Sequence, residues 1–294
     1  MEAARDSKSR LSDEDFKFIC KFVYDSTGIV LNDSKREMVY RRLARIVRER
    51  KLDSFEQYCQ MLKQQPEQEI DFFVNAITTN LTSFFREQHH FDYLLANEIP
   101  NLLTFGKVEN NSKKRLRIWS SASSTGEEPY SIAMTLLEAF HGELKNWDVK
   151  ILATDIDSNV LSHGKGGIYD INKITDIPPD YKNKYFTKGV GKNANKVKVN
   201  ENVQKLITFK QLNLLHEWPM KGPFDVIFCR NVIIYFDKET QKELFARYYG
   251  LLKPGGLLIL GHSESLGQFA PHFDNVGRTI FRKPNGLSYT TRSG

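Results

Sequence analysis

A run of small residues, Ser121 to Gly126, lies between an apolar segment and a pair of glutamates, Glu127 and Glu128. The apolar segment, residues 117–120, alternates as a buried strand does. Pro129 fits the first turn of a helix that begins at the glutamates. Because small side chains let the backbone approach a ligand closely, this strand, loop and helix could hold a nucleotide-like cofactor. The pattern alone fits an ordinary strand-to-helix connection equally well.

An acidic residue, Asp155, follows a second apolar segment at 149–154. Dinucleotide-binding folds place an acidic residue there to accept hydrogen bonds from ribose hydroxyls. Its alternative role is to cap the helix expected from about residue 157, although Asp157 is the better cap. The small-residue loop contains one glycine, Gly126, whereas a dinucleotide fingerprint has three. A pyrophosphate would approach this backbone with difficulty, so we expect a cofactor without phosphates.

Several ordered blocks of sequence resemble the CheR family of chemotaxis receptor methyltransferases. The blocks are TTNLTSFFRE at 78–87, SSASSTGEEPYSIAM at 120–134, ATDIDSNVL at 153–161, FDVIFCRNVIIYFDKET at 224–240 and KPGGLLILGHSE at 253–264. The resemblance spans residues from about 11 to 282. It implies transfer of a methyl group from S-adenosylmethionine to glutamate side chains of chemoreceptors, giving glutamate methyl esters and S-adenosylhomocysteine.

The resemblance also implies roles for single residues. Arg86 and Tyr235 are the implied catalytic residues, because the tyrosine matching Tyr235 lies by the transferable methyl in relatives. The implied cofactor-binding residues are Asn80, Thr82, Arg86, Glu128, Asp155, Asn213, Leu214, Arg230 and Asn231. From the residues alone, 78–87 would be a linker with a helix cap, and Tyr235 a buried aromatic side chain. Glu128 could be held by the helix dipole, but the resemblance favours a contact with the cofactor's amino group.

The implied reaction needs little acid or base catalysis. A free glutamate has a pKa of about 4.3, so it is already an ionised nucleophile at neutral pH. The protein would have to align the carboxylate with the methyl group and remove water from it. Arg86 could hold the carboxylate, and Tyr235 could position the methyl group or polarise the site.

The first 78 residues predict helices only. Apolar stripes at helical spacing run through residues 16–23, 39–47, 55–62 and 70–77. Ser12 precedes the first stripe and Gly28 follows it, as expected of a helix start and end. Such stripes form a helical core more often than a cofactor site.

Beyond about residue 115, apolar strands alternate with helices. The expected strands are 116–120, 149–154, 206–210, 225–229 and 257–261, and the expected helices are 128–141, 157–164 and 238–252. Alternation of this kind predicts a mainly parallel sheet covered on both faces, a doubly wound, Rossmann-like α/β fold of the methyltransferase type. Thr279 to Phe281 could add an edge strand. We expect three parts: a helical domain at 1–78, a linker at 79–86 that contributes to the cofactor site, and a catalytic domain at 87–294.

Residues 166–204 interrupt the alternation and are too long for a simple connection. Alternating Lys196 to Val199 predicts a small antiparallel sheet inserted in the catalytic domain. A disordered basic loop is the alternative. Gly189 and Gly191 resemble the glycine-bearing loop of family members that bind a C-terminal receptor pentapeptide, so they are implied receptor-binding residues.

A basic segment dominates the charge of the chain, whose net value is +6. Residues 35–51 hold eight Lys or Arg against Glu37 and Glu49, so we expect few acidic partners there. Arg41, Arg45 and Arg48 fall opposite the apolar stripe of their helix and are implied to bind the receptor's methylation region. A solvated charged face is the commoner meaning of such a run.

The remaining composition excludes several classes of protein. The three cysteines are far apart and the seven histidines form no ligand pattern, so no metal site is expected. The N-terminus lacks the apolar core of a signal peptide, and no apolar run could span a bilayer, which predicts a cytoplasmic protein. A nucleic-acid methyltransferase is one alternative, although no Asn-Pro-Pro-aromatic motif is present. A non-catalytic, cofactor-sensing adaptor is another.

Overall fold

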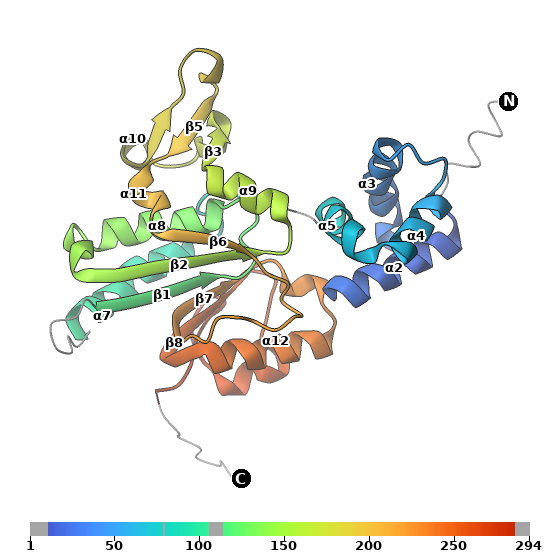
Figure 1. Cartoon of the computed structure of the whole chain (residues 1–294). Coiled ribbons are helices and arrows are strands. Elements are labelled where there is room, and N and C mark those ends of the chain that lie inside the picture. The colour runs from blue at the N-terminus through green and yellow to red at the C-terminus, as the bar shows by residue number, and fades with distance from the viewer. Residues whose placement is uncertain (1–10, 79, 106–113, 286–294) are drawn as a thin grey trace, which may run out of the picture.

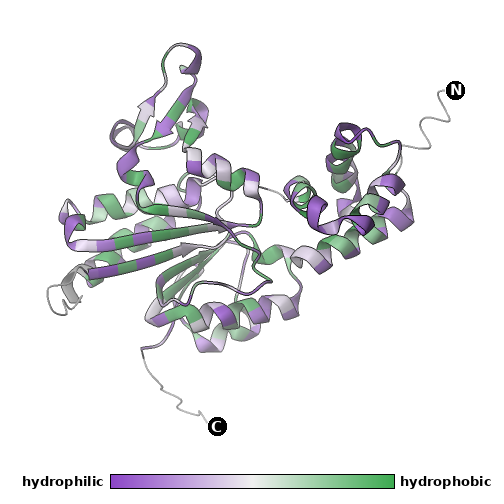
Figure 2. Ribbon diagram, in the orientation of Figure 1, coloured by the Kyte–Doolittle hydropathy of each residue, from purple (hydrophilic) through white to green (hydrophobic). Residues whose placement is uncertain are grey.

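The computed structural model describes residues 11–78, 80–105 and 114–285, and begins with a group of amphipathic helices. These are α2 (Asp13–Thr27), α3 (Arg36–Glu49), α4 (Phe55–Gln64) and α5 (Pro66–Ile77), with a 3-10 turn at Asp33–Lys35 before α3. They lie together beside the sheet in Figure 1, and in Figure 2 each carries both hydrophobic and hydrophilic residues. Their apolar faces form one core, which includes Phe16, Leu43 and Phe73.

The ends of these helices follow the expected capping chemistry. The Ser12 hydroxyl accepts a hydrogen bond from the Asp15 N–H at 3.0 Å, and α2 ends at Gly28 with a φ of 69°. Ser54 caps α4 in the same way as Ser12 caps α2, and Pro66 occupies the first turn of α5. The helical prediction for this region is confirmed.

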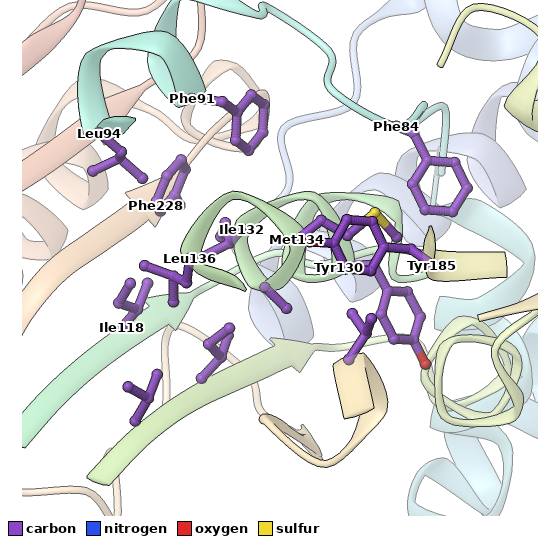
Figure 3. Packing of buried hydrophobic residues seen from close by; sticks show 14 of the residues in the cluster. Phe84, Phe91, Leu94, Ile118, Tyr130, Ile132, Met134, Leu136, Tyr185 and Phe228 are labelled. Atoms are coloured by element: carbon purple, nitrogen blue, oxygen red, sulfur yellow. The ribbon is translucent and has the colours of Figure 1, made fainter. Parts of the chain in front are cut away.

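A helical segment not anticipated from the sequence leads into the sheet. It consists of α6 (His89–Tyr93), a π-helical turn η2 (Leu94–Glu98) and α7 (Ile99–Phe105). Phe91 and Leu94 are fully buried and join the core beneath α8 (Glu127–Ala139). Figure 3 shows the side chains of both residues near Phe228.

The central sheet has seven strands in the order β6-β2-β1-β7-β8-β10-β9. The parallel strands are β1 (Lys114–Ser120), β2 (Trp147–Asp155), β6 (Ile207–Gln211), β7 (Phe224–Cys229) and β8 (Leu252–Leu260). The antiparallel strands are β9 (Asp274–Gly277) and β10 (Ile280–Arg282). The mainly parallel, doubly wound sheet is confirmed. The expected edge position of Thr279–Phe281 is wrong, because β10 lies between β8 and β9.

Helices cover both faces of this sheet. Neighbouring residues of β1 point to opposite sides: Ile118 packs under α8, whereas Trp119 packs with α12 (Lys238–Leu251). Figure 3 shows Ile132 and Leu136 of α8 beside Ile118. α9 (Ser158–Gly166) follows β2 and contacts β6 and β2. The carboxyl ends of the parallel strands are thereby left at one edge, where α/β folds bind ligands.

The inserted segment forms a separate three-stranded antiparallel sheet, as expected. Its order is β3-β5-β4, with β3 (Ile168–Asp170), β5 (Lys196–Val199) and β4 (Phe186–Lys188). Short helices α10 (Pro179–Tyr185) and α11 (Glu201–Gln204) flank it, and Figure 1 shows it projecting from the main body. Among the described residues, no helix is long and apolar enough to cross a membrane.

Candidate cofactor site

A cavity of about 370 Å³ lies at the carboxyl edge of the sheet, between the sheet and the helical region. Thr27, Met38 and Ile77 of the helical region line one side of it. All the residues that the resemblance implied for cofactor and catalysis also line it: Asn80, Thr82, Arg86, Glu128, Asp155, Asn213, Leu214, Arg230, Asn231 and Tyr235. The fold thus brings together side chains from four of the five family blocks and from the segment at 213–214.

The loop after β1 is held by backbone and side-chain contacts at its turn. The Ser123 N–H donates to the Thr154 carbonyl at 2.8 Å, and the Ser124 N–H donates to Asp155 Oδ2 at 2.8 Å. Gly126 has a φ of 98°, and a Cβ there would lie 2.9 Å from both the Gly164 Cα and the Tyr169 hydroxyl. Only glycine therefore fits this position without a shift of its neighbours.

Asp155 is 8% exposed and combines backbone contacts with a place in the cavity wall. Besides the Ser124 N–H, it accepts the Asp157 N–H on Oδ1 at 3.0 Å. Burial raises the pKa of Asp155 to about 6. Each carboxylate oxygen can accept a further hydrogen bond, so the ribose role is sterically and chemically open to it.

Asp157, not Asp155, caps α9. Its Oδ1 accepts the N–H groups of Asn159 at 2.9 Å and Val160 at 3.3 Å, which confirms the expected cap. Its Oδ2 accepts from the Thr78 hydroxyl at 3.0 Å and from Asn80 Nδ2 at 2.8 Å. The Asn80 amide therefore ties the segment after α5 to the start of α9, and its side chain serves the architecture as well as the cavity.

Glu128 and Arg230 form a buried ion pair. Arg230 Nη1 lies 2.8 Å from Glu128 Oε2, and the Ser120 hydroxyl donates to Glu128 Oε1 at 2.8 Å. The Arg230 side chain is 2% exposed, lies 3.3 Å from Glu87 Oε2, and also donates to the carbonyl of Arg86. Arg230 thus positions both the carboxylate of Glu128 and the backbone of Arg86 in the cavity wall.

The two implied catalytic residues lie in the same cavity wall. Arg86 Nη1 donates to the Leu81 carbonyl at 2.9 Å, which holds the guanidinium over its own segment. Tyr235 ends a 3-10 turn, η6 (Ile233–Tyr235), and its carbonyl accepts the Val30 N–H at 2.8 Å. A contact with the helical region therefore fixes the backbone of Tyr235.

Asn213 connects the α/β domain to the end of α2. Its Nδ2 donates to the Ser26 carbonyl at 2.8 Å, while its Oδ1 accepts the Leu215 N–H at 3.0 Å. Leu214 is buried, and its carbonyl accepts from Trp218 and Arg247. A cofactor contact at this loop would fall to its backbone and to apolar surface, because the Asn213 side chain already binds the Ser26 carbonyl and the Leu215 N–H.

The implied receptor-binding residues lie outside the cavity lining. Arg41 Nε pairs with Glu37 at 2.8 Å and Arg45 Nε pairs with Glu49 at 2.7 Å, with both arginines largely exposed. The expected scarcity of acidic partners is therefore wrong, because the i,i+4 geometry of α3 brings both acids of the segment against these arginines. Gly189 and Gly191 lie in the loop between β4 and β5.

Sequence reasoning missed the cavity residues from the helical region and two carboxylates of the surrounding network, Glu87 and Glu264. Glu87 is the last residue of the first block, and Glu264 is the last residue of the GHSE sequence that follows β8. Both had a signal, since each closes a block that resembles the family. Neither was assigned a role.

The donor set suits S-adenosylmethionine. Asp155 and Glu128 offer carboxylates for ribose hydroxyls and for a cationic amino group, and Ile156 and Leu212 add apolar surface for an adenine. The loop after β1 contains only one glycine, so its backbone is poorly suited to surround a phosphate group. The groups present therefore match the parts of this cofactor.

Comparisons with known proteins agree. The SAM-binding domain of CheR methyltransferases matches residues 80–282, and the all-alpha domain of the same family matches residues 14–78. Chemotaxis protein methyltransferase 2 of Pseudomonas aeruginosa is 44% identical over 271 residues, covering 91% of this chain and 92% of that protein. The chemotaxis protein methyltransferase of Salmonella typhimurium is 43% identical over 273 residues, covering 92% and 90%.

Solved structures match more weakly. A DszA carbon methyltransferase aligns at a TM-score of 0.41 with 15% identity, over 80% of this chain and 64% of that one. The family matches, in contrast, cover nearly all of the described chain. The chain therefore belongs to the CheR methyltransferase family, and the cofactor of this methyltransferase is S-adenosylmethionine.

Proposed function

We propose that this methyltransferase esterifies glutamate side chains in the cytoplasmic domains of chemotaxis receptors. The observation that carries the proposal is the convergence of Arg86 and Tyr235 on the cavity that Asp155 and Glu128 line. The names of the relatives, chemotaxis protein methyltransferases, support the receptor as substrate. A substrate in receptor cytoplasmic domains would place the enzyme in the cytoplasm.

The proposed reaction depends on placement more than on proton transfer. When bound, S-adenosylmethionine supplies a methyl group that is already activated on a sulfonium. The substrate glutamate, with a pKa of about 4.3 when free, arrives ionised and needs no base. The guanidinium of Arg86 orients the incoming carboxylate, and Tyr235, which lines the same cavity, positions the methyl group.

The other proposed site residues hold the cofactor. Asp155 accepts from the ribose hydroxyls, and Glu128 attracts the amino group while Arg230 keeps its carboxylate in place. Thr82, Asn213, Leu214 and Asn231 complete the wall. The helical region closes the cavity from the other side through Thr27, Met38 and Ile77, which limits the access of water to the carboxylate.

Nothing in the described part of the chain favours the alternatives. A nucleic-acid methyltransferase would need a stacking site for a flipped base. Two arginines of the basic helix α3 are also paired with acids of the same helix, Glu37 and Glu49. A non-catalytic adaptor would not need Arg86 and Tyr235 beside the cofactor carboxylates.

The test is methyl transfer from labelled S-adenosylmethionine to receptor-containing membranes, scored as label released by mild base. Wild type should form base-labile methyl esters on receptor glutamates, and Arg86→Ala and Tyr235→Phe should slow turnover at least about tenfold, as expected for lost transition-state contacts. Arg115→Ala and Tyr249→Phe change the same residue types outside the cavity lining and should leave turnover intact. Label that is stable to base, or full activity in both cavity variants, would contradict the proposal.

A further inference from the structure

The loop that follows β7 carries cofactor-site residues in an unusual backbone conformation. Asn231 has a φ of 57°, in the left-handed region that non-glycine residues seldom adopt. Val232 to Tyr235 then tighten into the turn η6, in which the Tyr235 N–H donates to the Val232 carbonyl at 3.1 Å. Such a loop needs an external group to hold it, because its first N–H groups have no partner within a helix or strand.

One buried side chain, Glu264, supplies that group. Its Oε2 accepts the N–H of Asn231 at 2.8 Å and the N–H of Gly261 at 2.7 Å. Its Oε1 accepts the N–H groups of Val232 at 2.9 Å and Ile233 at 2.8 Å. Successive N–H groups after a left-handed residue form a concave anion site, and here the anion is part of the same chain.

Glu264 reaches the loop from the neighbouring strand without entering the cavity. It follows β8 in a turn in which its own N–H donates to the Gly261 carbonyl at 3.0 Å. The residue is 6% exposed and does not belong to the cavity lining, whereas Asn231 and Tyr235 do. Any influence of Glu264 on the site therefore passes through the loop.

The surroundings of Glu264 are adapted to this contact. A Cβ at Gly261 would lie 2.7 Å from Glu264 Oε2 and 2.9 Å from the Asn231 backbone nitrogen. Burial raises the pKa of Glu264, and the four N–H groups oppose that shift because they bind the charged form. With four donors already around its two oxygens, the carboxylate has no acceptor position left for a proton.

We propose that Glu264 is a positioning residue that holds the loop 231–235 in the conformation needed for cofactor binding and methyl transfer. The effect of Glu264 on turnover rests on the proposed function, whereas its effect on cofactor binding depends only on the cofactor site. A glutamine at this position would keep the shape but turn an NH₂ group against two of the four N–H donors. The loop would then lose its preferred conformation at Asn231 and Tyr235.

The first experiment compares Glu264→Gln with Glu98→Gln. Glu98 is also a buried carboxylate of the α/β domain, but it pairs with Arg282 at 2.7 Å and lies outside the cavity lining. Thermal melting and calorimetric titration with S-adenosylhomocysteine are measured for both, together with kcat on receptor. We expect Glu264→Gln to weaken S-adenosylhomocysteine binding several-fold and to lower kcat about tenfold, whereas Glu98→Gln should change only the melting temperature.

A double-mutant cycle separates positioning from general destabilisation. If Glu264 acts through Tyr235, combining Glu264→Gln with Tyr235→Phe should lower kcat little beyond the slower single variant. Glu264→Asp keeps the charge but shortens the side chain by one methylene, which withdraws the carboxylate from the four N–H groups, and it should reproduce both effects. If Glu264→Gln does not fold, this variant replaces it in the measurements of S-adenosylhomocysteine affinity and kcat.

Wild-type kcat and wild-type S-adenosylhomocysteine affinity in folded Glu264→Gln would overturn the inference. So would equal losses of affinity in Glu264→Gln and Glu98→Gln, or losses of kcat that simply multiply in the cycle. If wild type binds S-adenosylhomocysteine but methylates no receptor, the proposed function fails. The titrations with S-adenosylhomocysteine then decide the role of Glu264 by themselves.

Discussion

Asp155 is both a backbone-bound carboxylate and part of the cavity wall, so its charge state should control cofactor affinity. Its pKa is raised to about 6 because burial disfavours the charged form. Above that pH the ionised group can accept from ribose hydroxyls, and below it the proton occupies an acceptor position. S-adenosylhomocysteine affinity should therefore fall as pH drops from 7.5 to 5, approaching about tenfold per pH unit below 6.

The control for this pH dependence is Asp155→Asn, which keeps the shape and cannot titrate. Calorimetric titrations of this variant should give weak binding that varies little between pH 5 and 7.5. Equal pH profiles for wild type and variant would remove Asp155 from the ribose contact. The charge of the neighbouring Asp157 adds to burial in raising the pKa of Asp155.

The same pKa shift predicts how the stability of the unliganded protein depends on pH, and this dependence is opposite in sign to that of cofactor affinity. The folded pKa lies above the ordinary value of 3.8, so between about pH 4 and 6 the folded state binds more protons than the unfolded state. The contribution of Asp155 to the free energy of unfolding must then decrease as pH rises through this range and stay constant above it. Denaturant unfolding of wild type and Asp155→Asn across pH 4 to 7 should differ by this slope. If the free energy of unfolding of wild type minus that of Asp155→Asn increases as pH rises, the pKa assignment of Asp155 is wrong.

The sequence indicated which residues belong to the site, but it did not indicate which residues they contact. The residues implied by the family blocks do line one cavity. The pairing of Glu128 with Arg230, 102 residues apart, depends on β1 lying beside β7 and has no local signal. The same holds for Glu264, whose four partners include three on another strand's loop.

Among the elements, the turn between β1 and α8 requires a glycine at position 126. Gly126 and Gly142 have similar φ values, 98° and 90°, but a Cβ at Gly126 meets neighbours at 2.9 Å and one at Gly142 meets nothing within 4 Å. Each alanine substitution should cost roughly 1–2 kcal/mol for the left-handed backbone, and Gly126→Ala should cost more because of the contacts.

Thermal or denaturant unfolding of the two glycine variants measures that difference directly. Gly126→Ala should also weaken S-adenosylhomocysteine binding, since the loop it anchors donates to Asp155. Gly142→Ala should leave cofactor affinity unchanged. Equal destabilisation of the two variants would mean that the close approach of Gly164 and Tyr169 relaxes at little cost.

Strands and helices with strong periodicity could be predicted, and their order in the sheet could be predicted only in part. The parallel strands and α8, α9 and α12 match the expected segments closely, except that β8 begins five residues before the expected 257–261. The position of β10 was wrong because Asp274–Gly277, the true edge, is polar and lacks the alternation of a strand. The helices α6 and α7 were missed because short helices carry little periodic signal.

At the scale of the whole molecule, the helical region is fastened to the site by several contacts near the end of α2. Tyr24 donates to Asp237 at 2.6 Å, and the Val30 N–H and Ser26 carbonyl bond to Tyr235 and Asn213. These bonds connect the helical region with loops that line the cavity. Their arrangement could not be read from sequence, because each joins residues far apart in the chain.

The exposed arginines of α3 should dock the receptor's methylation region, although two of them pair with acids of their own helix. Exposed i,i+4 pairs are weak and can be exchanged for charges on a partner. Replacing both Arg41 and Arg45 with Glu should impair receptor methylation at low salt and leave S-adenosylhomocysteine affinity unchanged. The matched control is the reversal of two other exposed lysines, Lys145 in the turn before β2 and Lys150 within β2. Equal methylation by both double variants would show that α3 does not bind the receptor.

The inserted sheet should tether the enzyme to the receptor's C-terminal tail. Within the described residues, β3 and β4 each pair only with the central β5, so an extended peptide could add a strand at either edge. The loop beside β4 is tightly built: a Cβ at Gly189 would lie 2.1 Å from the Asn193 carbonyl oxygen, and Val190 is 85% exposed beside it. Glycines and an exposed apolar side chain together suit a peptide that carries an aromatic residue.

Deleting residues 189–191 should abolish binding of an aromatic- and acid-containing tail peptide, measured by calorimetry. Tethering raises the local concentration of substrate to about the mM range, so the deletion should lower methylation of intact receptor at low concentration. It should not change S-adenosylhomocysteine affinity, because the loop lies outside the cavity lining. It should also spare the rate on a receptor that lacks its tail, since the chemical step does not involve this loop. Peptide binding that survives the deletion would show that this loop is not the tether.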